Sequence, residues 1–135
     1  MASLTNIRNG IGTALENISS LIVYKYIPDS IEPPTAVVGV VDTVDYDLTD
    51  ARGADRYTIP VFLYVSRVDA QDSQETLDSY LASTGSSSVK AQVESDVSLG
   101  GAANSVRVIE CKEVGLYNIN NIDYLGAEFT VEVIA

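Results

Sequence analysis

Residues 57–65, Tyr-Thr-Ile-Pro-Val-Phe-Leu-Tyr-Val, decide the fold of this chain. Alternate residues of a β-strand point to opposite faces of its sheet, and here both sets are largely apolar. One set is Tyr57, Ile59, Val61, Leu63 and Val65, and the other is Thr58, Pro60, Phe62, Tyr64 and Ser66. The pattern therefore predicts a strand with a covering layer on each face. Pro60 has no N–H to donate, which favours an edge position or a bulge.

The rest of the chain divides into strand and helix patterns around this stretch. Branched and aromatic residues predict strands at residues 21–27, 36–41, 105–117 and 124–134, with a bulge near Ile109. Apolar residues three and four positions apart predict helices at residues 4–20, 72–83 and 89–97. Together they predict one α+β domain over residues 1–135, with a mainly antiparallel sheet and with an N-terminal helix and a central helix pair packed on one face.

A protruding polar hairpin is predicted at residues 42–56. Its carboxylates are Asp42, Asp45, Asp47, Asp50 and Asp55. Carboxylate oxygens can hold a hard cation such as calcium. The spacing lacks the glycine and the terminal glutamate of a calcium-binding loop, so a solvated or interface loop is the favoured interpretation.

The chain is strongly acidic, which limits the ligands that it attracts. Its 135 residues include 19 Asp plus Glu, 8 Lys plus Arg and no His, for a formal net charge of −11. Such a surface repels nucleic-acid phosphates and anionic lipid, so groove binding and membrane-surface binding lose their electrostatic driving force. The excess lies mainly in residues 68–135, with 11 acids and 3 bases, against 8 acids and 5 bases in residues 1–67.

No constellation of residues indicates catalysis, a cofactor or a bound metal. Without His, the chain has no Ser-His-Asp or Cys-His arrangement and no imidazole ligand. Cys111 is the only cysteine, and its apolar strand context predicts a buried small hydrophobe. Gly10, Gly12, Gly100 and Gly101 lack the partners of a phosphate-binding loop, so turn and close-packing roles are expected. We therefore expect a protein that is not an enzyme.

Two further expectations concern location and association. The first residues contain no basic segment followed by an apolar run, and no apolar run is long enough to cross a bilayer, so a soluble protein made inside the cell is expected. The expected helices suffice for one face of the strand at residues 57–65. The other face, with Phe62 and Tyr64, is then available for contact with another copy of the chain.

Taken in order, these features resemble the tail terminator proteins of long-tailed bacteriophages of the lambda type, or a closely related phage neck protein. The resemblance covers nearly the whole chain and rests on order and spacing. The matching features are Ile7, Ile11 and Leu15, Tyr24-Lys25-Tyr26-Ile27-Pro28, Pro33-Pro34 before Ala36-Val37-Val38, Asp45-Tyr46-Asp47, the strand at residues 57–65, the helix at residues 72–83, Ser88-Val89-Lys90-Ala91, and Tyr124-Leu125-Gly126-Ala127.

The resemblance implies a structural virion protein that forms a homo-hexameric ring, terminates the tail tube and joins it to the head connector. The implied partners are other copies of the chain, the tail tube protein and the head–tail connector proteins. DNA would pass through the lumen without specific binding, and no membrane and no cofactor are expected. The implied location is the tail or neck of the virion, after synthesis in the host bacterial cytoplasm. The alternative is a head-completion or connector adaptor protein of the phage neck.

The candidate interface residues follow from the hairpin and the apolar strand. The contact with tube or connector is expected on the hairpin, and the contact between protomers on the strand. The residues are Asp45, Tyr46, Asp47, Asp50, Arg52 and Arg56 in the hairpin, and Phe62 and Tyr64 in the strand. The acidic second half of the chain is where we expect the lining of the lumen.

Overall fold

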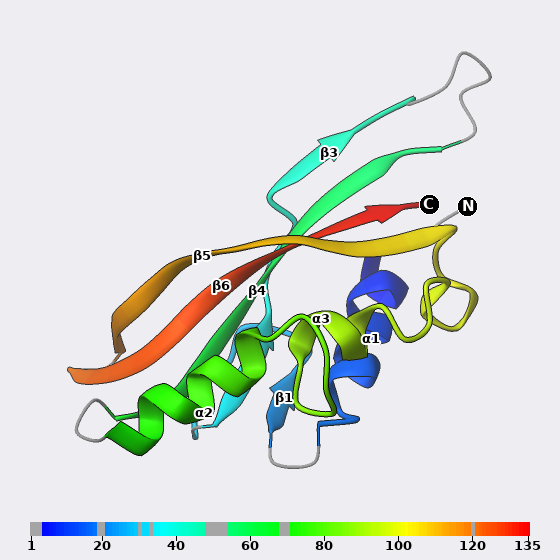
Figure 1. The fold of residues 1–135 in the computed structure, drawn as a ribbon. Helices are drawn as coiled ribbons and strands as arrows, with labels where there is room; N and C mark the ends of the chain where they lie inside the picture. The colour runs from blue at the N-terminus through cyan, green and yellow to red at the C-terminus, as the bar shows by residue number, and fades with distance from the viewer. Residues whose placement is uncertain are drawn as a thin grey trace.

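The elements of the domain follow the predicted order, with one additional short strand. The structure, a computed structural model, describes residues 4–18, 21–29, 31–32, 34–47, 54–67, 71–119 and 121–135. The elements are α1 (Leu4–Leu15), β1 (Ile22–Tyr24), β2 (Thr35–Val38), β3 (Thr43–Asp45), β4 (Arg56–Arg67), α2 (Gln71–Leu81), α3 (Val89–Val93), the 3-10 turn η1 (Leu99–Gly101), β5 (Ser105–Ile119) and β6 (Ile122–Ile134). The predicted α+β class is confirmed (Figure 1).

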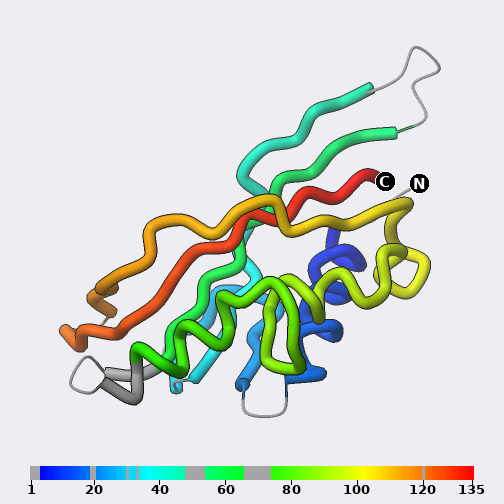
Figure 2. Tube along the Cα trace, in the orientation of Figure 1, coloured from blue at the N-terminus to red at the C-terminus, as the bar shows by residue number. Residues whose placement is uncertain are grey.

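The sheet is built around β4 and β6. Its strand order is β1-β2-β4-β6-β5, and β3 pairs with β4 beyond the end of β2. β1 runs parallel to β2, whereas every other pair is antiparallel. β5 and β6 form a long hairpin, and the two strands run side by side from end to end (Figure 2). β4 is therefore a central strand, with β6 on one side and with β2 and β3 in succession on the other.

One face of this sheet meets the helices in a continuous apolar core. Val61 of β4 lies opposite Phe129 of β6 and Leu63 lies opposite Ala127, and all four are at most 2% exposed. The helices add Ile7, Ile11, Leu15, Leu77, Tyr80, Val89 and Val93 to the same core. Burying one large aliphatic side chain contributes roughly 1.5–3 kcal/mol, so this face holds the domain together.

Pro60 lies within the sheet, opposite the gap between the neighbouring strands β2 and β3. The amide of Gly39 donates to the carbonyl oxygen of Pro60 at 2.8 Å, and Pro60 has no N–H with which to return the bond. Val38 pairs with Val61, and Thr43 pairs with Thr58. The chain therefore advances five residues from β2 to β3 while β4 advances three. The prediction that Pro60 lies in an edge strand was wrong, because β4 has neighbouring strands on both sides. The missing N–H of Pro60 is tolerated because β2 ends and β3 begins beside it.

Several elements are shorter than predicted because turns interrupt the apolar spacing. α1 ends at Leu15, although Ile18 in the following turn is still buried. α3 begins at the predicted cap, where the Ser88 Oγ accepts the Ala91 amide at 3.1 Å. It ends at Val93, so Val97 leaves the apolar stripe and is 54% exposed.

The prediction that Cys111 is buried was wrong. The expected bulge is present between Val108 and Glu110, and Cys111 lies opposite Phe129 of β6. Val106 and Val108 are buried, whereas the residues from Ile109 to Val114 are exposed. Cys111 is therefore in the part of this edge strand that the core does not cover.

Close packing explains one of the two glycines of α1. A Cβ at Gly10 would lie 2.8 Å from the Cβ and 3.0 Å from the carbonyl oxygen of Leu99, whereas a Cβ at Gly12 would meet the side chain of Lys25. Leu99 is buried and belongs to a tight turn with a φ of 50°, so it has little room to move. The Lys25 side chain lies at the surface and can adopt another rotamer.

We expect Gly10→Ala to lower stability and Gly12→Ala, the matched control, to leave it unchanged or raise it. Alanine gains up to about 1 kcal/mol over glycine in a helix, but overpacking against Leu99 costs about 1–3 kcal/mol. Thermal unfolding followed by circular dichroism should show a midpoint a few degrees lower for Gly10→Ala alone. Equal midpoints for the two variants would contradict the close contact of α1 with Leu99.

Candidate functional site

The face of the sheet opposite the helices is the candidate functional surface, and we call it the open face. The even-numbered residues of β4 from Arg56 to Tyr64 lie on it, because Ile59, Val61, Leu63 and Val65 point into the core. It has two distinct parts. Near β3 it carries charged residues, and near β1 it carries aromatic and aliphatic residues.

The charged part consists of ion pairs that cross the strands. Arg56 lies between Asp45 and Glu132, with nitrogen–oxygen distances of 3.8 and 3.7 Å. Lys112 lies 3.7 Å from Glu128 in the next strand. These distances exceed those of good hydrogen bonds, and the Nε of Arg56 is buried without a hydrogen-bond partner. Such exposed pairs contribute little to stability, so this region remains available for other charged groups.

The apolar part contains a shallow hollow of about 160 Å³. Its floor is Val37, Phe62 and Tyr64, from neighbouring strands β2 and β4. Its walls are Ile27, Pro28, Asp29, Ile31 and Ile119. The segment after β1 therefore covers part of the second face of β4. Coverage is partial, since Phe62 and Tyr64 are only half-buried while Ile27, which lines the hollow with them, is 60% exposed.

A tyrosine cluster borders the hollow where β6 contains Gly126. The rings of Tyr64 and Tyr117 meet edge to face with centroids 5.5 Å apart, and Tyr124 lies 6.3 Å from Tyr64. A side chain at Gly126 would collide with the carbonyl oxygen of Leu63 and press on both Tyr64 and Tyr117. Glycine is therefore required here by the close approach of strand and rings.

The predicted hairpin forms the other end of the same face. Asp45 pairs with Arg56 in the register of β3 with β4, and the amide of Asp47 donates to Asp55 Oδ1 at 2.9 Å. Tyr46 is 73% exposed. We call residues 42–47 with residues 54–58 the arm. Asp50 and Arg52, which were also expected in this interface, lie outside the described residues.

The candidate residues thus fall into two separate groups. Asp45, Tyr46, Asp47 and Arg56 share the arm, whereas Phe62 and Tyr64 share the hollow. Sequence reasoning missed the walls of the hollow and the tyrosine cluster. Pro28 and the exposed Ile27 gave a signal for a chain reversal, but only the tertiary fold shows that the segment returns over Phe62.

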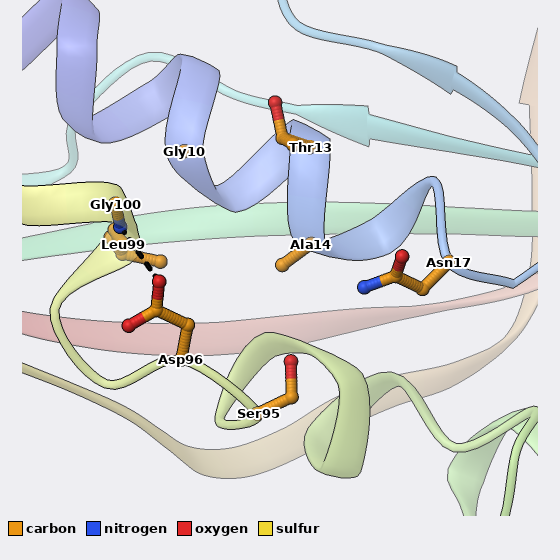
Figure 3. Close-up of a pocket in the computed structure, with 8 residues that line it drawn as sticks. All are labelled: Gly10, Thr13, Ala14, Asn17, Ser95, Asp96, Leu99 and Gly100. Atoms are coloured by element: carbon orange, nitrogen blue, oxygen red, sulfur yellow. Dashed lines mark hydrogen bonds between the residues drawn. The ribbon is translucent and has the colours of Figure 1, made fainter.

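A second, more polar cavity of about 320 Å³ lies between α1 and the loop before η1. Asn17, Ser95 and Asp96 face this space, as Figure 3 shows. The carboxylate of Asp96 accepts hydrogen bonds from the Ser98 hydroxyl and amide and from the Gly100 amide, and these bonds lower its pKa. Asp96 therefore has a structural role in shaping this loop.

The tyrosine cluster provides a titration test of the open face. Burial, followed by the nearby charge of Glu113, raises the pKa of Tyr117 to about 12. The unfolded chain loses this proton near pH 10. Its contribution to stability is therefore complete below about pH 10 and is lost as the pH rises toward 12.

We expect the stability of the wild type to fall more steeply than that of Tyr117→Phe between about pH 9 and 11. Chemical denaturation at both pH values measures the difference, and tyrosinate absorbance shows which transition the substitution removes. Tyr46→Phe is the matched control, because this exposed ring lies outside the cluster. Equal pH dependence in wild type and Tyr117→Phe would contradict the raised pKa of Tyr117.

Comparison with known proteins identifies no family for this chain: no protein-family model matches it, and no curated protein matches it significantly. Within the described residues, no three acidic or cysteine side chains gather as a metal site would require. None of the helices described is long and apolar enough to cross a membrane. The arm and the open face are thus the features from which a function can be inferred.

Proposed function

We propose that this chain is a structural virion protein that forms a ring, terminates a phage tail tube and joins the tube to the head connector. The proposal joins the resemblance stated above to one observation, which is the incompletely covered open face. A second copy of the chain would cover the hollow at Phe62 and Tyr64. A homo-hexameric ring is the form that the resemblance implies.

The exposed apolar residues beside the hollow support a protein partner for this face. Ile27 is exposed next to the apolar floor of the hollow, and Tyr26, its neighbour in the chain, is exposed as well. Exposed apolar surface of this kind favours protein–protein contact. The charged pairs at Arg56 and Lys112 border the same face, and a polar rim of this kind is typical of an interface. Together they support the hollow as the centre of the protomer contact.

The arm supports a second contact at another place on the protomer. Its β3 side carries the exposed Tyr46 together with Asp42, Asp45 and Asp47. Aromatic side chains are enriched in protein interfaces. We assign this contact to the tail tube protein or to a head–tail connector protein. The remaining acidic surface would face DNA in the lumen without binding it, because like charges repel.

The alternative is a head-completion or connector adaptor protein, which would use the same two surfaces in a ring that does not end the tube. The two functions differ in what their loss does to the virus. A mutant virus without a terminator should make overlong tails, whereas one without an adaptor should make tails of normal length that are detached from heads.

Electron microscopy and sedimentation of the purified chain test the proposal directly. We expect closed rings whose mass corresponds to several copies of the 14.4 kDa chain. A compact monomer at all concentrations would contradict ring formation. If rings form, complementation of the mutant virus then distinguishes terminator from adaptor by tail length.

A charge placed beside the hollow should weaken the ring without unfolding the protomer. We expect Ile27→Asp to raise the concentration needed for association about tenfold or more, because an unpaired charge would be buried in the contact. Val97→Asp is the matched control, since Val97 is similarly exposed but belongs to the helical layer. Sedimentation velocity and thermal unfolding measure the two effects, and equal association of the two variants would exclude the hollow from the contact.

A further inference from the structure

The outer edge of β5 is a place where a strand of another protein chain could pair with the sheet, more than at its other edges. β5 runs from Ser105 to Ile119, and among the described residues it pairs with β6 alone, so no described strand lies on its far side. An edge of this length offers backbone N–H and C=O groups to any other strand. The strands on the opposite side, β1 and β3, contain only three residues each, and such short edges pair poorly.

Lys90 of α3 and Glu94, which follows the helix as its C-terminal cap, bond the backbone groups of Val108 on this edge. The Val108 amide donates to Glu94 Oε2 at 2.9 Å, and the Val108 carbonyl accepts from Lys90 Nζ at 3.3 Å. The N–H and C=O of one strand residue point to the same side, so both bonds lie on the outer edge. These are the two bonds that a residue of a neighbouring strand would make.

The two side chains also hold each other in position. Lys90 Nζ lies 2.5 Å from Glu94 Oε2, one helical turn away. Desolvation alone would raise the pKa of Glu94, but the bonds from Lys90 and the Val108 amide, with the nearby charges of Lys90 and Arg107, lower it. Glu94 therefore remains a charged acceptor for the Val108 amide over the physiological pH range.

The core fixes the helix that carries this pair. Val89 and Val93 of α3 are fully buried, and so is Ser88. The Ser88 Oγ accepts the Ala91 amide and donates to the Ala82 carbonyl. Lys90 and Glu94 thus project from a rigid support, which suits a role that depends on their position. An ion pair at the surface contributes little to stability by itself.

The rest of the β5 edge is irregular. The strand has a register shift between Val108 and Glu110 and another between Lys112 and Gly115. Glu113 has a φ of 53°, which turns the backbone out of a regular strand. Bulges of this kind prevent a second strand from following the edge. The regular part of the edge is therefore the part before Ile109, where Lys90 and Glu94 are placed.

We propose that Lys90 and Glu94 form an edge guard: by bonding both backbone groups of Val108 they substitute for a neighbouring strand and prevent another copy of the chain from extending the sheet at β5. Copies of the chain then associate through surfaces such as the open face and the arm, and not through the edge of β5. Unlimited growth by strand addition is blocked at the one long edge.

The double variant Lys90→Ala/Glu94→Ala of the full chain tests this proposal. At a protein concentration below the onset of association, we expect the Val108 amide to exchange with solvent about tenfold faster or more, because its acceptor is removed. We also expect assemblies that grow with protein concentration in sedimentation velocity and that bind thioflavin T. The matched control is Lys25→Ala/Glu16→Ala, which removes another surface ion pair, away from β5 and outside the proposed contacts, and should behave as the wild type does.

A conservative variant separates the edge guard from a general loss of stability. Glu94→Gln keeps an oxygen that can accept the Val108 amide, so it should keep the association behaviour of the wild type, whereas Glu94→Ala should not. Circular dichroism establishes that each variant is folded. The proposal is overturned if the folded double variant, or folded Glu94→Ala, sediments as the wild type does at every concentration. It is equally overturned if exchange at Val108 does not change.

Discussion

The pairing of β4 with β6 forms the centre of the apolar core: α2 lies against both strands, while α1 lies against β2 and α3 against β5 on either side. Every other element takes its place from this pair. β2 and β3 follow one another along the free side of β4, and β5 follows the free side of β6. Because the odd-numbered residues of β4 fill the core, its even-numbered residues are committed to the opposite face. The surface proposed for assembly is therefore a direct consequence of the way the core is made.

The open face and the helical face differ in how completely they are covered. The helical face is closed by long apolar side chains from three helices, such as Ile11, Leu77 and Val93. On the open face, the described residues that lie around Val37 and Phe62 belong to the segment after β1, together with Ile119. They leave Phe62 and Tyr64 only half-buried. This incomplete coverage is the physical basis for proposing contact with other copies.

Much of this fold can be predicted from local patterns, and the exceptions have definable causes. The strand at residues 57–65, the capped start of α3 and the bulge near Ile109 are all evident in the sequence and confirmed. The position of Pro60 is not, because it depends on where a neighbouring strand ends. The exposure of Cys111 depends on how far the helical layer reaches, which no strand pattern contains. The hollow depends in the same way on a chain reversal that brings Ile27 over Phe62.

The break opposite Pro60 divides one strand between two tasks. From Val61 onward β4 pairs with β2 and fills the core, and up to Thr58 it pairs with β3 and belongs to the arm. Tyr57 of the arm still packs against the core, whereas Tyr46 is largely exposed. The same strand thus supplies the centre of the core and one side of a hairpin, and Pro60, which has no N–H to donate, marks the boundary between the two.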